Sequence, residues 1–368
     1  MKFIINREHI LNPLQQIVSV IEKRQTMPIL SNILIVIDGK KLVLTGTDLE
    51  IQIIAHIDID SAESGAITLT ARKFLDICRL LPLQADIKIE QFGQDDKIKI
   101  SSGRSRFSLS SLPAENYPKF IETEFNNHFV ISAGKLKKAL EKTVFCMANQ
   151  DVRFYLNGLL LNISNQKLKM VTSDGHRLAI YEDNLQEPAG FEAKIVLPRK
   201  GVIELMRLLD DSDTELKIEF SDNNIRIYIN NLIFSAKLVD AKYPDYSKVF
   251  NQPFLNTLLV PKMLLKETLS RVAILSNEKF KGVSFDISTD SIKISAHNPE
   301  HEEAEEECLC EYTGEPLSIA FNIQYMLDAV SNLNSDVAAL NIASNASTCF
   351  IEEPNQQSYK FIVMSMRL

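Results

Sequence analysis

The sequence has little that would tie it to a membrane, a secretory route or a metal. No run approaches the roughly 20 apolar residues of a membrane helix, and residues 1–10 lack the basic-then-apolar layout of a signal peptide. Cysteine is scarce, with five residues in 368, and the absence of C-x-x-C spacing argues against both a disulfide framework and a zinc site. We therefore expect a cytoplasmic protein that needs no metal and no cofactor.

Catalytic motifs are also missing. The sequence contains no G-x-x-x-x-G-K-[ST], no G-x-G-x-x-G and no G-x-S-x-G. Ser173, Asp174 and His176 are the residue types of a nucleophilic triad. Neighbours on a strand point to alternate faces, so they could not form the required hydrogen-bond chain. We expect a protein that is not an enzyme, and an enzyme using Asp174 and His176 stays an alternative.

One acidic segment carries two histidines and is a candidate metal site. His297 and His301 precede or flank the glutamates of 302–303 and 305–307. Two histidines four residues apart chelate one metal on a continuous helix, and Pro299 lies between them. The segment is therefore interpreted as a solvated or partner-facing surface.

A domain-sized repeat organises the chain. Asp48, Asp174 and Asn298 hold equivalent positions in the stretches T-G-T-D-L-E, V-T-S-D-G-H and S-A-H-N-P, and they lie 126 and 124 residues apart. Solenoid repeats run at about 20–50 residues, so this period indicates whole domains. A second marker, a phenylalanine that closes a β-rich run, recurs at intervals of 127 residues: Phe107, Phe234 and Phe361.

We expect three tandem units over residues 1–121, 122–252 and 253–368. Each unit is predicted to have two helices on one face of antiparallel strands, which makes it an α+β domain. Apolar periodicity predicts helices over 7–21, 72–81, 134–147, 200–209, 262–275 and 323–333. Continuous strands are expected over 41–53, 167–180 and 359–364.

Basic residues gather on the predicted helices, although the net charge is −8. Lys135, Lys138 and Lys142 fall at i, i+3 and i+7, which predicts one narrow stripe. Such stripes suit phosphate contacts, but an acidic chain would not hold DNA by global attraction, so topology would have to retain it. Similar spacings give the remaining candidates for DNA contact: Arg72, Arg79, Lys200 and Arg207.

Eight stretches spread over all three units resemble the β subunit of bacterial DNA polymerase III, the sliding clamp family. These are T-M-P-I-L-S-N-I-L (26–34), T-G-T-D-L-E (45–50), S-G-R-S-R-F-S-L-S-S-L-P-A (102–114), D-V-R-F-Y-L-N-G (151–158), S-D-G-H-R-L-A (173–179), P-R-K-G-V-I-E-L-M-R (198–207), A-I-L-S-N-E-K-F-K-G-V (273–283) and M-S-M-R-L (364–368).

The resemblance implies a DNA-clamp domain repeated three times, with two chains closed head to tail into a six-domain ring. Helices would line the hole, and the ring would encircle duplex DNA without sequence preference. It would tether the replicative polymerase, so that rebinding becomes intramolecular, and would dock the clamp loader, other polymerases and repair proteins through short peptide motifs. A scaffold protein whose repeats form an open rod is the remaining alternative.

Three sets of residues carry over from the resemblance. For DNA it implies Arg24, Gln150, Phe154 and Tyr155, with Phe154 where the family commonly has tyrosine. For a hydrophobic pocket that binds partner peptides it implies Leu156, Ser173, Gly175, His176, Arg177, Leu178, Pro244, Lys248, Val249, Phe280, Asn322, Tyr325, Ala346, Thr348, Ile362, Val363, Met364, Ser365, Met366 and Arg367. For the dimer interface it implies Phe107 and Leu109 against Ile274 and Leu275, with Lys73, Arg104 and Arg106 facing Glu300, Glu302 and Glu303.

Overall fold

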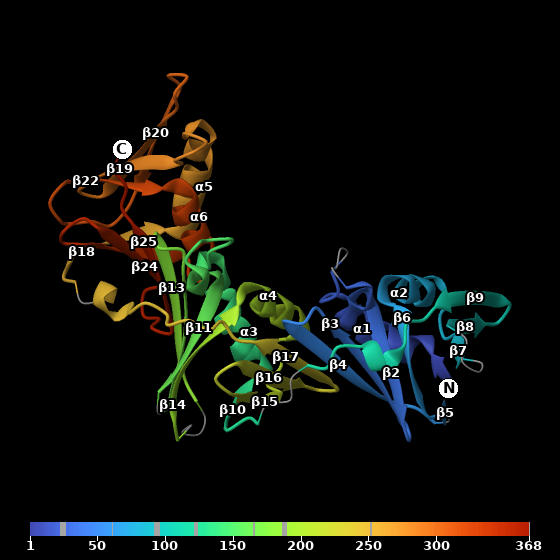
Figure 1. The fold of residues 1–368 in the computed structure, drawn as a ribbon. Helices are drawn as coiled ribbons and strands as arrows, with labels where there is room; N and C mark the ends of the chain where they lie inside the picture. Colours follow the sequence, from blue (N-terminus) through green and yellow to red (C-terminus); the bar gives the residue numbers. More distant parts are fainter. Residues whose placement is uncertain are drawn as a thin grey trace. The chain divides into compact units, whose positions relative to one another are not determined.

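The computed structural model (Figure 1) describes residues 1–22, 27–60, 62–91, 96–120, 124–164, 166–185, 190–250 and 252–367. The chain divides into two compact units, the first of residues 1–137 and 200–238, the second of residues 138–199 and 239–368. Helices α3 (Ala133–Glu141) and α4 (Arg199–Leu208) lie where the chain passes between these units.

The first unit contains two antiparallel sheets. One has the strand order β5-β1-β7-β8-β9 and the other β10-β15-β16-β17-β4-β3-β2-β6. Its elements are β1 (Lys2–Asn6), α1 (Arg7–Val18), β2 (Asn32–Asp38), β3 (Lys41–Thr47), β4 (Ile51–Asp58), β5 (Ala62–Glu63), β6 (Gly65–Thr70), α2 (Ala71–Leu80), β7 (Asp86–Gln91), β8 (Lys97–Ser102), β9 (Ser105–Ser110), β10 (Asn127–Ser132), β15 (Glu215–Phe220), β16 (Asn224–Ile229) and β17 (Leu232–Lys237).

The second unit also contains an eight-stranded antiparallel sheet, of order β14-β11-β12-β13-β25-β24-β23-β18, and a smaller one with four strands instead of five, β21-β20-β19-β22. Its elements are β11 (Gly158–Ser164), β12 (Lys167–Ser173), β13 (Arg177–Asn184), β14 (Glu192–Pro198), β18 (Phe254–Pro261), α5 (Lys262–Val272), the 3-10 turn η6 (Ala273–Leu275), β19 (Gly282–Ser288), β20 (Ser291–His297), β21 (Glu303–Leu309), β22 (Leu317–Asn322), α6 (Ile323–Ser331), β23 (Val337–Ala343), β24 (Thr348–Glu352) and β25 (Tyr359–Met364).

Amphipathic sequence and capping explain the helices. In α1, Ile10, Leu14 and Ile17 form a fully buried stripe, and the side chain of Asn6 accepts a hydrogen bond from the Glu8 N–H at the first turn. Asn322 caps α6 in the same way. In each unit the two helices that follow one another in the repeat lie side by side, α1 with α2 and α5 with α6 (Figure 1).

Two predicted continuous strands are each divided in the structure, because the chain reverses direction at the repeated aspartate. Residues 41–53 were predicted as one strand but form β3 and the start of β4, and residues 167–180 form β12 and the start of β13. The Oδ1 atom of Asp48 accepts hydrogen bonds from the Glu50 and Ile51 N–H groups, and Asp174 accepts them from His176 and Arg177. This side-chain-to-backbone bonding makes a tight turn that strand periodicity alone does not reveal.

Strand pairing joins consecutive repeats into continuous sheets. Strand β4, which follows the first turn, pairs with β17 and places Ile53 opposite Phe234. Strand β13, which follows the second turn, pairs with β25 and places Ala179 opposite Phe361. The boundaries of the two compact units therefore differ from those of the repeats, because strands pair between repeats as well as within them.

Candidate peptide pocket, basic helices and free sheet edges

The turn from Ser173 to Arg177 is held by its own side chains. The Ser173 hydroxyl donates to the Arg177 carbonyl at 2.7 Å and accepts from the Gly175 N–H at 3.0 Å. Gly175 has φ +90°, a conformation that favours glycine. Strand β12 ends at Ser173 and β13 begins at Arg177, so the predicted strand does not run through Asp174 and His176. The Asp174 carboxylate accepts hydrogen bonds from the turn backbone and from the Arg177 guanidinium.

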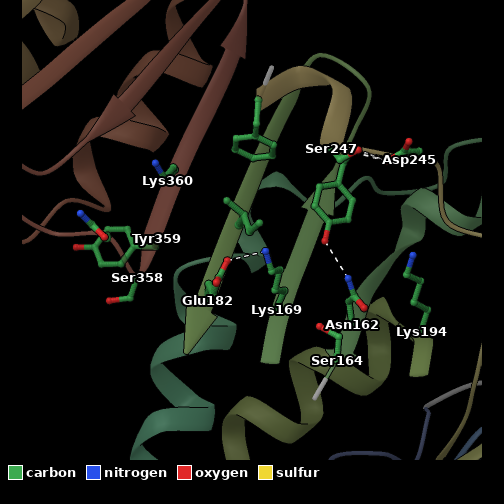
Figure 2. Close-up of a pocket in the computed structure, with 14 residues that line it drawn as sticks. Asn162, Ser164, Lys169, Glu182, Lys194, Asp245, Ser247, Ser358, Tyr359 and Lys360 are labelled. Carbon is green, nitrogen blue, oxygen red and sulfur yellow. Dashed lines mark hydrogen bonds and ion pairs between the residues drawn. The ribbon is translucent and has the colours of Figure 1, made fainter. Parts of the chain in front are cut away.

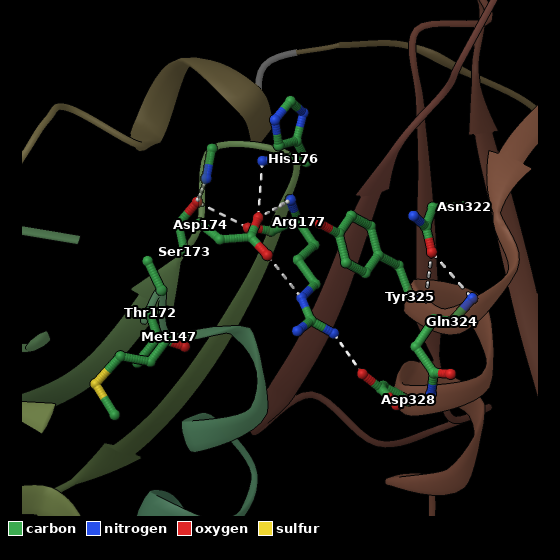
Figure 3. A network of polar contacts seen from close by, with 12 residues as sticks. Met147, Thr172, Ser173, Asp174, His176, Arg177, Asn322, Gln324, Tyr325 and Asp328 are labelled. Atoms are coloured by element: carbon green, nitrogen blue, oxygen red, sulfur yellow. Dashed lines mark hydrogen bonds and ion pairs between the residues drawn. The ribbon is translucent and has the colours of Figure 1, made fainter. Parts of the chain in front are cut away.

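Arg177 ties this turn to α6 (Figure 3). Its Nε donates to Asp174 Oδ2 at 2.9 Å, and its Nη1 donates to Asp328 Oδ2 at 2.6 Å. The guanidinium also lies over the ring of Tyr325, 4.4 Å from the centroid, and faces Phe145. Its side chain is 13% exposed, so the two carboxylates compensate a largely buried charge.

The C-terminal tail runs from this turn across to β22. The Met364 N–H donates to the His176 carbonyl at 2.9 Å, Ser365 to Ser347 at 2.9 Å, and Met366 to Ala320 at 2.7 Å. Strand β25 ends at Met364, as predicted, but these bonds continue to order the chain beyond it. Met364 is 45% exposed.

The residues predicted to form the peptide pocket range from buried to exposed. Leu178 lies opposite Ile362 across β13 and β25, and Arg177 lies opposite Val363. Val249, from the segment that links the second and third repeats, packs on this apolar cluster. Leu156 and Thr348 are also buried, whereas Phe280 is 58% exposed. Pro244 and Lys248 lie in the linker between the second and third repeats, Ala346 lies in the turn before β24, and Arg367 lies in the tail.

Sequence reasoning missed Arg153 at this site. Its Nη2 donates to the Asp174 carbonyl at 3.0 Å and to the Asp151 carboxylate at 2.8 Å. A Cβ added to Gly175 would lie 2.7 Å from Arg153 Nη1, so the guanidinium fills the space over the turn. Hydrogen bonding from Arg153 lowers the pKa of Asp151 to about 2. The motif D-V-R-F contains the residue, but no local pattern indicates that it reaches Gly175.

A polar groove on the same eight-stranded sheet was also missed (Figure 2). It encloses about 510 Å³ and is lined by residues of β11, β12, β13, β14 and β25 and by the linker. Asn162 donates to the Tyr246 hydroxyl at 3.1 Å, and Lys169 pairs with Glu182 at 2.7 Å. Its residues come from six separate segments, so no motif in the sequence could point to it.

The basic residues predicted to contact DNA differ in their exposure. Arg72, Arg79, Lys135, Lys138 and Arg207 are exposed on their helices. Arg72 also donates to the Ile21 carbonyl at 2.9 Å, and Arg207 pairs with Glu204 at 2.8 Å. In the loop before β11, Gln150 and Phe154 are exposed and Tyr155 is half-buried, and Arg24 lies outside the described residues.

Two lysines among these candidates are less exposed, and their ammonium groups are held by contacts within the protein. Lys142 does not share the stripe of Lys135 and Lys138, because α3 ends at Glu141 and the Lys142 side chain turns inward. Its ammonium donates to the Asn332 carbonyl and to Asn334 Oδ1 at 2.9 Å, and burial lowers its pKa. Lys200 donates to the carboxylates of Glu22 and Asp48, and its side chain is 31% exposed.

The residues predicted to form a dimer interface lie at the free edges of the two smaller sheets. Strand β9 carries Arg106, Phe107 and Leu109 and is the last strand of its sheet, and β21, which begins at Glu303, is the last strand of the other. Phe107 is 37% exposed. Ile274 of η6 is 76% exposed. Lys73, Arg104, Leu275, Glu300 and Glu302 are at least partly exposed in the adjoining helix and turns.

Comparisons with known proteins agree over the whole chain. The DNA polymerase III beta subunit family matches in three parts: its N-terminal domain over residues 1–121, its central domain over 130–245 and its C-terminal domain over 247–367. The chain belongs to this family.

Relatives in the beta subunit family align from end to end. The Beta sliding clamp of Pseudomonas aeruginosa is 41% identical and that of Escherichia coli K12 is 42% identical, each covering 100% of both chains. A crystal structure of the Pseudomonas aeruginosa sliding clamp superposes with a TM-score of 0.96 at 40% identity, and that of Caulobacter crescentus with 0.95 at 31%, each over 100% of both chains. One Pseudomonas aeruginosa clamp is bound to griselimycin.

Among the residues that the structure describes, no group of three or more histidines, cysteines or carboxylates could hold a metal ion. Within the same residues, no helix is long and apolar enough to cross a membrane.

Proposed function

We propose that this chain is a DNA sliding clamp, in which two copies close head to tail into a ring around duplex DNA and tether the replicative polymerase. The observation that carries the proposal is the pairing between repeats. Within the chain, the strand after each turn pairs with the strand of the next repeat that carries the repeated phenylalanine. Strand β4 pairs with β17, which carries Phe234, and β13 pairs with β25, which carries Phe361. The equivalent strands of the third junction, β21 and β9, are both sheet edges. A second copy supplies the missing partner for each.

The register of this intermolecular pair follows from the two junctions inside the chain. In each junction, the last residue pair before the turn closes it. The repeated phenylalanine of the next repeat lies opposite the residue that follows this closing pair along the chain. Gln52 closes the first turn against Thr47, and Phe234 faces Ile53. Leu178 closes the second against Ser173, and Phe361 faces Ala179.

His297 closes the third turn against Glu303. Phe107 of one copy is therefore expected opposite Ala304 of the other, and Arg106 opposite Glu305. Arg106 and Glu305 are both exposed. Glu303 and Glu307 lie two residues to either side of Glu305, within reach of the Arg106 guanidinium. The partners expected for Arg106 are therefore the carboxylates of β21, rather than Glu300 or Glu302 in the turn before it.

Apolar contacts would close the same interface. Ile274 is 76% exposed just after α5, next to Leu275, and Phe107 and Leu109 lie opposite the buried Ile100 and Ile98 of β8. An exposed isoleucine and phenylalanine at complementary edges favour association, and the charged ladder fixes a single antiparallel pairing. A head-to-tail contact of this kind closes into a ring with two copies when the rotation permits it.

The ring explains how an acidic chain holds DNA. The exposed arginines and lysines of α2, α3 and α4 make weak phosphate contacts that salt screens, and encirclement retains the duplex. The pocket at the second turn docks polymerases, the clamp loader and repair proteins one at a time through apolar peptide residues. We place the repeat borders at residues 1–121, 122–252 and 253–368, and the protein in the cytoplasm.

Charge reversal at the new register tests the proposal. Arg106→Glu should give folded monomers in sedimentation velocity, because it faces the carboxylates of β21. Arg106→Glu combined with Glu305→Arg should restore the dimer. Lys194→Glu, an exposed lysine on β14, is the matched control and should remain dimeric. A dimer that survives Arg106→Glu unchanged would contradict the pairing of β9 with β21.

A further inference from the structure

The polar groove of Figure 2 is distinct from the candidate peptide pocket. None of its lining residues is among those that the family resemblance implies for the pocket, and all of them belong to the second compact unit. Tyr246 and Phe250 of the linker pack on the apolar cluster that contains Leu178, and both also line the groove. The amide of Asn162 donates to the Tyr246 hydroxyl at 3.1 Å. The groove is therefore a separate hollow with an aromatic wall.

Strand register spaces three lysines across the groove. Asn162 of β11 lies opposite Lys194 of β14 and also opposite Lys169 of β12. Ile180 of β13 lies opposite Lys360 of β25. Residues opposite each other on neighbouring antiparallel strands project from the same face of the sheet. Neighbouring strands lie about 4.8 Å apart. Each lysine is two strands from the next, so the three follow one another at intervals of about 10 Å across the sheet.

Positive charge exceeds negative charge in the groove. The Glu182 carboxylate is shared by two ammonium groups, those of Lys167 at 2.8 Å and Lys169 at 2.7 Å. The other charged residues of the groove and its ion-pair partners are two lysines and two carboxylates: Lys194, Lys360, Asp245 and Glu352. The whole chain carries a net charge of −8. The groove is thus a local positive site on an acidic protein, and charge complementarity selects an anionic partner.

The polyproline II conformation matches the spacing of the lysines. A polyproline II chain has three residues per turn and rises about 3.1 Å per residue, so every third side chain lies on one face, about 9 Å from the previous one. An extended β-strand would place its same-face side chains about 7 Å apart. Polyproline II segments also dock in grooves lined by aromatic residues, and Tyr246 and Phe250 provide such a wall.

We propose that the polar groove is a docking surface for an acidic segment of a partner protein in the polyproline II conformation, with a carboxylate at every third residue. The carboxylates meet Lys194, Lys169 and Lys360 in turn, and the intervening prolines lie against the aromatic wall. The surface goes beyond the proposed function, because it involves neither the tail nor the turn at Asp174. It shares no lining residue with the candidate peptide pocket, so both sites are occupied at the same time.

Two peptides of equal composition test the spacing on the full-length protein. Fluorescence polarisation would compare fluorescein-labelled Glu-Pro-Pro-Glu-Pro-Pro-Glu with Glu-Glu-Glu-Pro-Pro-Pro-Pro. The spaced peptide should bind with a Kd about fivefold lower, because only its carboxylates reach all three lysines. Raising the salt concentration from about 50 to about 300 mM should weaken this binding, because the ion pairs are partly exposed to solvent.

Charge reversal locates the binding site of the spaced peptide. Lys194→Glu and Lys360→Glu should each raise its Kd about five- to tenfold, because an attraction is replaced by a repulsion. Lys194 is exposed, so its substitution should leave the fold intact, which circular dichroism checks. Lys41→Glu, at an exposed lysine of the other compact unit, is the matched control and should leave the Kd unchanged.

Four results would overturn the proposal. Two are equal affinity of the two peptides and a Kd that neither lysine variant changes. The third is displacement of the spaced peptide by an oligothymidylate or by inorganic phosphate, which would assign the groove to nucleic acid or to a simple anion. The fourth is displacement by a peptide built around Gln-Leu-Phe, which would merge the groove with the candidate peptide pocket. Failure of the Gln-Leu-Phe peptide to bind would instead contradict the proposed docking function, and the groove would be judged by the spaced peptide alone.

Discussion

The first and second turns perform the same structural task with different side chains. In both, an aspartate Oδ1 accepts two backbone hydrogen bonds, and the following strand pairs with the next repeat. The position after Asp48 is Leu49, at φ +79°, whereas the position after Asp174 is Gly175, at φ +90°. The first aspartate is neutralised by Lys200 of α4, and the second by Arg177 within the turn itself.

The two turns therefore differ in the side chains that surround them. Leu49 is 37% exposed at the first turn, whereas Gly175 of the second turn lies beneath the guanidinium of Arg153. Arg177 also donates a hydrogen bond to Asp328, so it connects the second turn directly to α6. The same repeated geometry serves strand continuity at both places.

The largest effect is expected from Arg177→Met. The substitution leaves Asp174 and Asp328 without their cation in a site where the arginine side chain is 13% exposed. Breaking such a buried pair costs about 3–5 kcal/mol. Urea unfolding should show this loss of unfolding free energy. Lys137→Met, whose partner Asp211 is 84% exposed, is the control and should cost about 0.5 kcal/mol or less. Similar losses in the two variants would contradict the special role of Arg177.

Lys200→Met at the first turn should cost less, about 1–2 kcal/mol. The lysine side chain is 31% exposed and one partner, Glu22, is 53% exposed, so solvent screens part of the interaction. Asp48 is 6% exposed, but it keeps its two backbone donors after the substitution. The same urea experiment checks the order of the two turns. A loss larger than that of Arg177→Met would reverse the comparison.

Substitutions at the two positive-φ positions, Leu49 and Gly175, should shift Tm in opposite directions. Leu49→Gly relieves a left-handed conformation that costs an L-residue about 1–2 kcal/mol, and should raise Tm slightly. Gly175→Ala introduces that strain and brings a Cβ against Arg153. It should lower Tm and weaken peptide binding. Differential scanning calorimetry on both variants measures the pair, and two shifts of the same sign would contradict the assignment.

The smallest predicted effect is a titration at Asp151. Its folded pKa of about 2 lies below the ordinary value near 3.9, because Arg153 hydrogen-bonds the carboxylate. A depressed carboxyl pKa stabilises the fold above the ordinary value, and the contribution is lost as pH falls from about 4 through about 2. Carboxyl-carbon NMR should record the low pKa in the native protein and a return toward 3.9 in Arg153→Gln. An ordinary pKa in the native protein would mean that Arg153 does not hold this carboxylate.

The sequence predicts helices and strands well where periodicity persists, and fails where side chains end it. Strand β25 matches the predicted range, and α2 differs by one residue at each end. The turns at Asp48 and Asp174 were missed because apolar alternation continues on both sides of them. The reversal depends on two hydrogen bonds to one carboxylate, which spacing does not encode.

Long-range contacts explain the remaining differences. Lys142 fits a helical stripe by spacing, but α3 ends one residue earlier and the side chain reaches Asn334, 192 residues away. The pairing of Phe234 with Ile53 likewise joins distant segments. The residues of the peptide pocket came from family resemblance rather than from local pattern, and Arg153 came from neither. Their positions depend on tertiary packing.

Retention on DNA of different topology tests the central claim most directly. The protein, loaded on nicked circular DNA by a cognate clamp loader, would be challenged with salt that removes phosphate contacts, and an identical sample would be linearised before the challenge. A closed ring should remain on the circle and slide off the linear molecule, as measured by gel filtration of labelled protein with DNA. Equal loss from circular and linear DNA would contradict encirclement.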